Sequence, residues 1–314
     1  MIAPLRLAWR LQRWEFAFVV IGGLGLAAVA FWQAFDMRSM LTGCGTPSAA
    51  PACEFVYPFQ TTHGNVVGLA QTLIGLAPFV AGLLLGVPIV AGEVEHRTAL
   101  LAWPLSGSRA RWLAWRVMPA LAISLVVMAV LSVAADLMAQ AYLPKSDLGF
   151  LHHAWRGLPL VMRAVVVLAL GVALGALMGR VLPALLVGIA LCVGLSVGLG
   201  LALDHWLPSQ VMTEDEGPLG LTGFPAVTDL RYRTPDGEII SAQEGELIVE
   251  QAYAAAIEAG RDEPDPATLP RPVFTGISAA RHGEVVLRES IALGALAIGL
   301  FGLAAFVVRR RRPE

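Results

Sequence analysis

Charged residues are scarce in this 314-residue sequence, where Asp, Glu, Lys and Arg together make up 15% of the chain. A soluble domain averages about 25%, so the composition excludes an ordinary soluble protein. What the sequence has instead is apolar: 56% of its residues are hydrophobic and the mean hydropathy is +0.67. Several apolar runs reach the roughly 20 residues that a helix needs to cross a bilayer. The chain is therefore predicted to be an all-α polytopic membrane protein.

Lysine is nearly missing, since Lys145 is the only one beside 21 arginines. A phosphate-binding P-loop needs a lysine after a glycine-rich turn, and no glycine stands at the required positions before Lys145, which excludes a P-loop ATPase. The G-x-S-x-G pattern at 194–198 lies inside an apolar run, so it indicates close helix packing, as do the glycines of GVALGALMG at 171–179. The pair His152 and His153 has no cysteine or carboxylate cluster beside it. We expect no catalytic residue, no metal site and no cofactor in this chain.

Cysteine is equally sparse, with three residues in the chain. Cys44 and Cys53 bracket the segment CGTPSAAPAC, which the topology derived below puts outside the cell. Two cysteines joined by a short loop in an oxidising compartment favour a disulfide, although the sequence does not give the Cα separation that a bridge requires. Cys192 lies in an apolar run and is expected to pack as a small apolar side chain.

Six membrane spans can be assigned, near residues 16–35, 66–91, 117–139, 158–178, 181–203 and 290–308. Arginine is concentrated in the short segments on one side of these spans, which predicts that this side is cytoplasmic. Both termini, the loop 92–116 and the basic tail 309–314 are then cytoplasmic, and residues 36–65 are external. Asp136 and Arg163 fall near span ends, where their side chains are expected to reach the interface. The predicted location is the plasma membrane.

Two segments outside the spans have structure of their own. Residues 1–15 read as an amphipathic helix lying on the membrane, with arginines on one stripe facing anionic lipid; the alternative is a simple extension of the first span. Residues 204–289, between the fifth and sixth spans, are predicted to be a small external α+β domain. In it, LRYRTPDGEIIS is typical of two strands joined by a turn, and AQEGELIVEQAYAAAIEAG of a helix closed by Gly260.

The loop after the second span is unusually rich in charge and tryptophan. AGEVEHRTALLAWPLSGSRARW, at residues 91–112, places two acids, three arginines and two tryptophans between apolar spans. A solvated turn needs few residues and no aromatics, whereas a docking surface combines an aromatic anchor with a charged rim. The composition favours docking, and a solvated turn is the alternative.

The same stretch carries a family resemblance. GVPIVAGEVEHRTALLAWPLSGSRARWLAWR resembles the region between the second and third spans of ABC type-2 exporter permeases, in particular their GC-rich Gram-positive branch. The matching residues are Gly86, Pro88, Ala91, Glu93, Glu95, Thr98, Leu101, Ala102, Trp103, Ser106, Arg109, Arg111 and Trp112. The family's usual glycine before the threonine is replaced by Arg97. The six spans and the large loop after the fifth extend the resemblance over the whole chain.

The resemblance implies the permease subunit of an ATP-driven exporter, a dimer bound to two copies of an ABC ATPase that binds ATP and Mg. The loop would couple to this ATPase through Glu93, Glu95, Arg97, Thr98 and Trp103, with Arg109, Arg111 and Trp112 anchoring the third span at the membrane surface. Spans two and five would line the substrate path, where they contain Gln71, Pro78 and Ser196. We expect a hydrophobic or amphipathic substrate (drug, peptide or lipid), the lipid bilayer as surroundings and no nucleic-acid partner. The alternatives are a non-transporting sensor or immunity subunit with this fold and, less favoured, an intramembrane enzyme.

Overall fold

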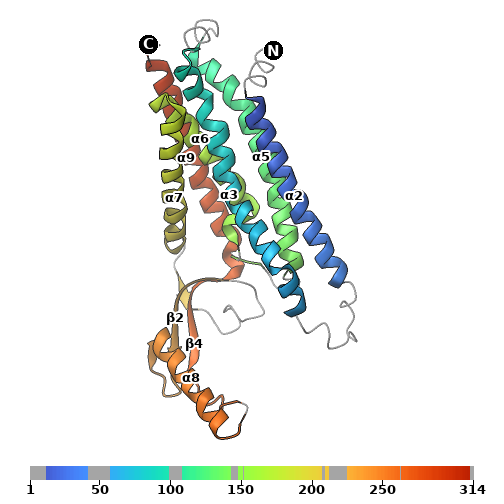
Figure 1. Cartoon of the computed structure of the whole chain (residues 1–314). Coiled ribbons are helices and arrows are strands. Elements are labelled where there is room, and N and C mark those ends of the chain that lie inside the picture. Colours follow the sequence, from blue (N-terminus) through green and yellow to red (C-terminus); the bar gives the residue numbers. More distant parts are fainter. Residues whose placement is uncertain are drawn as a thin grey trace. The chain divides into compact units, whose positions relative to one another are not determined.

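The computed structural model describes residues 12–41, 57–98, 108–142, 148–150, 152–206, 209–211, 225–261 and 263–311. The chain divides into two compact units. The larger one, called here the membrane unit, comprises the helices of residues 1–144, 152–199 and 286–314 (Figure 1). The smaller one comprises residues 145–151 and 200–285. Cys44 and Cys53, with their predicted disulfide, lie outside the described residues, as does most of the predicted N-terminal helix.

Within the described residues, six helices are long and apolar enough to cross a membrane. They are α2 (Arg13–Leu41), α3 (Tyr57–Glu95), α5 (Arg109–Tyr142), α6 (Gly157–Met178), α7 (Val181–Trp206) and α9 (His282–Arg310). Each covers one predicted span, so the six-span fold is confirmed. Most extend well beyond the apolar runs: α3 has 39 residues, or about 58 Å at 1.5 Å per residue. A helix continues through the interface because its backbone hydrogen bonds are internal and independent of side-chain polarity.

Helix α6 lies at the centre of the membrane unit and is the most buried of the six. It packs most extensively on α3, while α2 packs chiefly on α5. Its outer faces contact α7, through a cluster that includes Leu174 and Cys192, and α9, through a cluster that includes Ala169 and Leu293. The Cys192 thiol is free and buried, so this residue packs as the sequence predicts.

The contact between α3 and α6 depends on glycines from both helices. A Cβ atom on Gly86 would lie 2.6 Å from the carbonyl oxygen of Leu168, and one on Gly175 would lie 2.6 Å from that of Val87. Such distances leave no room for any side chain, so the two backbones touch directly, as small residues allow in membrane helices. The glycine pattern of the fourth span therefore predicted close helix packing correctly.

The smaller unit is an antiparallel sheet with one helix. Its strands are β1 (Gln210–Val211), β2 (Ala226–Arg233), β3 (Ile239–Ser241) and β4 (Arg271–Ile277), in the order β1-β4-β2-β3. Strands β2 and β3 form the hairpin that the sequence predicts, with Gly237 at φ 90° in the turn. Helix α8 (Ala242–Glu258) is preceded by Ser241, whose hydroxyl accepts from the Glu244 amide at 3.3 Å. This is an N-cap, which satisfies an amide that the helix itself leaves unpaired.

Candidate functional site

The second span ends later than the sequence predicts. Glu93 and Glu95 belong to the last turn of α3, and the backbone turns at 96–98. Both acids therefore belong to the second membrane-crossing helix and not to the predicted loop 92–116. Residues 99–107, including Trp103, lie outside the described part of the chain. Since α5 begins at Arg109, the connection between the two helices is residues 96–108, shorter than the predicted loop.

Glu93 joins the end of α3 to α5. Its carboxylate forms an ion pair with Arg116, and both side chains are nearly buried, at 12% and 10% exposed. The second carboxylate oxygen accepts from the Thr98 hydroxyl at 2.7 Å. The Arg116 guanidinium also lies 6.0 Å from the ring centre of Trp112. A buried charge is tolerated only with such partners, so these contacts explain why an acid can end an apolar helix here.

Glu95 joins α3 to α7. One of its carboxylate oxygens accepts from the backbone amide of Val181 at 2.8 Å, and Val181 is the first residue of α7. The first amides of a helix lack internal partners and carry a partial positive charge, so a carboxylate there is favourable. Glu95 thus acts as an N-cap supplied by another helix.

Arg109 and Arg311 join the start of α5 to the ends of two further helices, α9 and α6. The Arg109 guanidinium donates to the carbonyl oxygens of Val308, Arg309 and Arg311, at 3.3, 3.0 and 2.6 Å, where α9 ends. Arg311 in turn donates to the Ala176 carbonyl oxygen at 2.5 Å, in the last turn of α6. Cations at helix C-termini satisfy unpaired carbonyl groups and complement the helix dipole.

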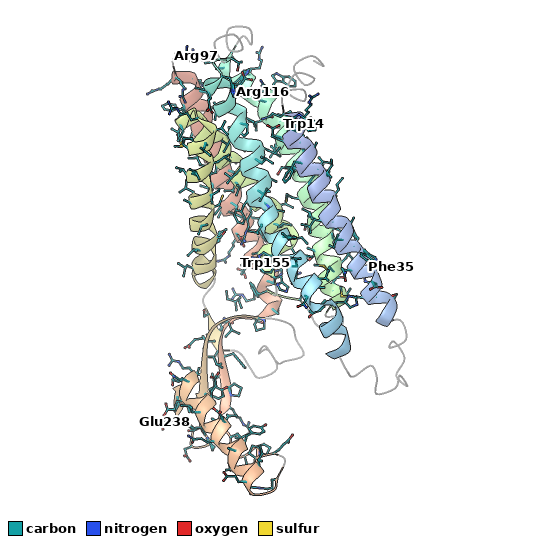
Figure 2. All side chains as sticks on the ribbon, in the orientation of Figure 1. Trp14, Phe35, Arg97, Arg116, Trp155 and Glu238 are labelled. Carbon is teal, nitrogen blue, oxygen red and sulfur yellow. The ribbon has the colours of Figure 1, made fainter. Side chains whose placement is uncertain are left out.

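Together Glu93, Glu95, Arg109, Arg116 and Arg311 form what we call the helix-end network. It connects α3, α5, α6, α7 and α9 at one end of the membrane unit, the end at which Figure 2 labels Arg97 and Arg116. Five of its contacts join residues 86 or more positions apart and use a backbone group, so no sequence pattern would have indicated them. Charges that the sequence assigned to a docking surface are thus used, in the structure, to join helices of the bundle.

The remaining residues predicted in this region differ in exposure. Arg97 is exposed and has φ 59°, the left-handed conformation that favours glycine. This is the position where the resembled family has glycine, so the backbone keeps the glycine-like turn with an arginine side chain. Arg111 is exposed. Trp112 is 7% exposed and belongs to the main core cluster, so its indole packs against protein rather than toward lipid headgroups.

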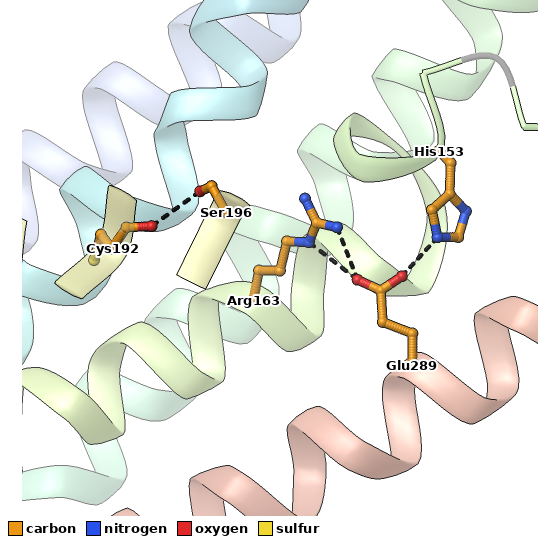
Figure 3. Close-up of polar contacts among 5 residues, drawn as sticks. All are labelled: His153, Arg163, Cys192, Ser196 and Glu289. Atoms are coloured by element: carbon orange, nitrogen blue, oxygen red, sulfur yellow. Dashed lines mark hydrogen bonds and ion pairs between the residues drawn. The ribbon is translucent and has the colours of Figure 1, made fainter. Parts of the chain in front are cut away.

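The three residues predicted for the substrate path are not brought together by any described contact. Gln71 is 8% exposed and Pro78 is buried, both within α3. Ser196 lies on the exposed side of α7, and its hydroxyl donates to the Cys192 carbonyl oxygen one turn earlier (Figure 3). Their role in a substrate path stays a prediction.

A second polar cluster, at the opposite end of α6, was missed by the sequence analysis. Glu289 of α9 is 1% exposed. One of its oxygens accepts from Arg163 of α6 at 2.8 and 3.2 Å, and the other lies 2.6 Å from Nε2 of His153 (Figure 3). The expectation that Arg163 reaches the interface is therefore wrong, because an internal carboxylate neutralises it. The sequence held no signal for this contact, because Arg163 and Glu289 are 126 positions apart.

Nearby polar residues on this side have simpler roles. His152 stacks on Trp155 at 5.2 Å between ring centres, and its burial, together with the positive charge of Arg156, lowers the pKa of its imidazole. Arg156 forms an ion pair with Asp136 at 3.2 Å. Among the described residues, no three His, Cys, Asp or Glu side chains gather in a way that would hold a metal ion.

Comparison with known proteins identifies the family. Residues 20–203, more than half of the chain, match the family described as "ABC-2 membrane transporter related". The chain belongs to this family. No curated protein and no solved structure matches it. The matched region contains α3, α5 and α6, most of α2 and α7, and the whole connection between α3 and α5, so the ABC-2 chain is a membrane transporter subunit with several membrane-crossing helices.

Proposed function

We propose that this chain is the permease subunit of an ATP-driven exporter in the plasma membrane, working as a dimer with two copies of a separate ABC ATPase. Membership of the ABC-2 family supports the partner, because permeases of this kind generally work with an ABC ATPase. The observation that carries the proposal is the helix-end network, in which charged residues join α3 and α5, the helices on either side of the connection 96–108, to each other and to α6, α7 and α9.

The network suggests how movement of the ATPase would reach the substrate path. A force on residues 96–108 acts on the end of α3 and the start of α5, which the ion pair of Glu93 and Arg116 joins. Through Glu95 the same end of α3 is attached to the start of α7. Helices α3 and α7 are the two proposed to line the path, so a single docking site would move both. The two prolines within α3, Pro78 and Pro88, allow the helix to bend under such a force.

Two substitutions separate docking from transmission. Trp103→Ala removes the proposed aromatic anchor, and truncation of such anchors commonly costs about 2 kcal/mol or more, or about 30-fold in Kd. We expect this variant to lose copurification with the ATPase. Glu95→Ala removes only the link to α7, so we expect it to retain the ATPase and its ATP hydrolysis while transport falls. Glu95→Gln keeps an oxygen acceptor for the Val181 amide and is the matched control, with transport near the wild-type rate.

The measurement is ATP-dependent uptake into proteoliposomes that contain the permease and its ATPase, using a lipophilic fluorescent dye and a short-chain fluorescent phospholipid as probes. If Trp103→Ala and Glu93→Ala both copurify with the ATPase and transport at wild-type rates, the connection is only a solvated turn. A complex that hydrolyses ATP but moves neither these probes nor a hydrophobic peptide would favour the sensor or immunity alternative.

The orientation follows from the distribution of arginine. We propose that the helix-end network and both termini face the cytoplasm and that residues 36–65 and 204–289 are external. A cysteine introduced at Gly237 should react with an impermeant thiol reagent from outside, whereas one at Gly107 should react only from inside. Labelling of the Gly107→Cys variant from outside would reverse the orientation and remove the basis for docking.

We propose that the two copies of the dimer contact each other through the exposed side of α7. The glycines of α6 are used within the chain, against α3, and so are not free to contact a second copy. On α7, a Cβ atom at Gly194 or Gly198 would meet no other atom within 4 Å, and both positions are exposed. Glycines four residues apart on an exposed membrane helix are typical of a helix-pairing surface. Disulfide formation between two copies of a Gly198→Cys variant would test this contact.

A further inference from the structure

An apolar hollow opens between α2 and α3 inside the membrane-crossing region. Its volume is about 320 Å³, and every side chain around it is apolar. Phe18, Gly22 and Leu26 of α2 form one wall, and Leu73, Leu76 and Val80 of α3 form the other. Phe18, Leu76 and Val80 are at least half exposed, so the hollow opens to the surroundings of the bundle.

The hollow is formed by two adjacent glycines of α2, Gly22 and Gly23, which have different surroundings. A Cβ atom on Gly23 would overlap the Val127 side chain of α5, so this glycine lets α2 lie directly against α5. A Cβ atom on Gly22 would meet nothing within 4 Å. The α2 backbone therefore leans on α5 and leaves open space beside α3 at the same level.

A basic and aromatic site lies at one end of the hollow. Trp14, Phe18 and Gly22 are spaced four residues apart, which puts them on one side of α2. Trp14 is 74% exposed and lies at the end of α2 opposite Phe35 (Figure 2). The Arg13 guanidinium lies 5.2 Å from its ring centre. Exposed tryptophan and arginine at the end of a membrane helix are typical of headgroup depth. Gly22 follows Arg13 by nine residues, or about 13 Å along the helix axis.

We propose that this hollow binds one acyl chain of an anionic phospholipid, with the headgroup phosphate held by Arg13 beside Trp14. The lipid would fill the space that Gly22 leaves, along the exposed faces of Phe18 and Leu76. The inference depends on insertion of the chain in a membrane and not on coupling to an ATPase.

The size and lining of the hollow favour a lipid over a helix of a second copy. A helix with its side chains is about 10 Å across, so two turns of it fill on the order of 800 Å³, more than twice the space available. Pairing surfaces for membrane helices also have small residues on both sides, whereas bulky Leu73 and Leu76 flank this hollow. Glu15 also lies in the first turn of α2, but residues two positions apart do not face each other on a helix, so Arg13 is the charge beside Trp14. This cation and the apolar interior match the two parts of an anionic lipid.

The test is native mass spectrometry of the full chain after equilibration with equal amounts of dioleoyl phosphatidylglycerol and dioleoyl phosphatidylcholine. A single arginine near a headgroup is expected to favour the anionic lipid about fivefold. Arg13→Gln should retain a bound lipid but lose this preference. Gly22→Leu places a side chain at a position where an added Cβ atom would meet open space, on the wall of the hollow, and should remove the bound lipid. Gly25→Leu is the matched control, since Gly25 is exposed on α2 outside the hollow and also has open space.

Three results would overturn the proposal. Retention of the same number of lipids by the Gly22→Leu variant would show that the hollow is not the site. An unchanged preference in the Arg13→Gln variant would show that Arg13 does not hold the headgroup. A shift from dimer to monomer in the Gly22→Leu variant, with lipid binding unchanged, would identify a second copy of the chain as the occupant.

Discussion

Glu289 provides the sharpest test of the packing inside the membrane unit. The Glu289→Leu substitution removes a carboxylate that accepts two hydrogen bonds from Arg163 and lies in hydrogen-bond contact with His153. Arg163 would then be a buried cation without its counter-charge. Breaking a buried ion pair by removing one partner costs about 3–5 kcal/mol, because the remaining charge stays desolvated. We expect the free energy of unfolding to fall by this amount.

A double variant distinguishes the net contribution of the ion pair to stability from the cost of leaving one of its charges unpaired. Arg163→Met combined with Glu289→Leu replaces both charges by apolar side chains of similar size, which is often neutral or stabilising. We therefore expect the double variant to recover most of the stability that Glu289→Leu loses. Asp136→Asn is a control at the same end of the bundle, since the pair of Asp136 with Arg156 is partly exposed and should contribute no more than about 1 kcal/mol.

The free energy can be measured by titrating the protein in mixed micelles with dodecyl sulfate and following helix content by circular dichroism. A loss of less than 1 kcal/mol for Glu289→Leu would show that breaking the ion pair costs little. A double variant no more stable than the single one would show that an unpaired Arg163 is not the cause of the loss. In either case the contact of α6 with α9 would depend on apolar packing, such as that between Ala169 and Leu293.

Other predictions follow from single positions. Arg97→Gly should raise the free energy of unfolding by about 1 kcal/mol, because glycine adopts the left-handed conformation without the steric cost that arginine has; a lower stability in the same titration would show that the side chain makes a contact worth more than the strain. Gly86→Val should unfold the protein or separate α3 from α6, since its side chain would meet the Leu168 carbonyl group, and a wild-type denaturation curve would contradict the close approach. Cys44 and Cys53 should appear as one disulfide-linked peptide in mass spectrometry without reduction, and detection of both thiols in free form would exclude the bridge.

The sequence predicts what depends on local composition. All six spans were found because an apolar run of about 20 residues has few other stable states, and the hairpin around Gly237 was found because its turn chemistry is local. The sequence did not predict where the helices end. Glu93 and Glu95 looked like the beginning of a loop, but they remain helical because Arg116 and the Val181 amide, 23 and 86 residues away, satisfy their carboxylates.

The cluster around Glu289 shows the same limit more strongly. Arg163 lies 126 residues from Glu289 in the sequence, and nothing in either neighbourhood indicates that the two helices meet there. Arg97 is the opposite case. Its replacement of a family glycine was visible in the sequence, and only the φ of 59° shows that the turn itself is unchanged.

The two acids at the end of α3 impose different rules on sequence variation. Glu93 binds a side chain, so its loss would leave Arg116 buried without an acid, and changes at these two positions should occur together in relatives. Glu95 binds a backbone amide, which every residue except proline supplies at position 181. The Glu95 contact therefore excludes only proline at position 181, and the exposed face of helix α7 can acquire a new sequence without losing this attachment to α3. A permease built in this way can change the helix proposed to contact its substrate and keep the connection that would move it.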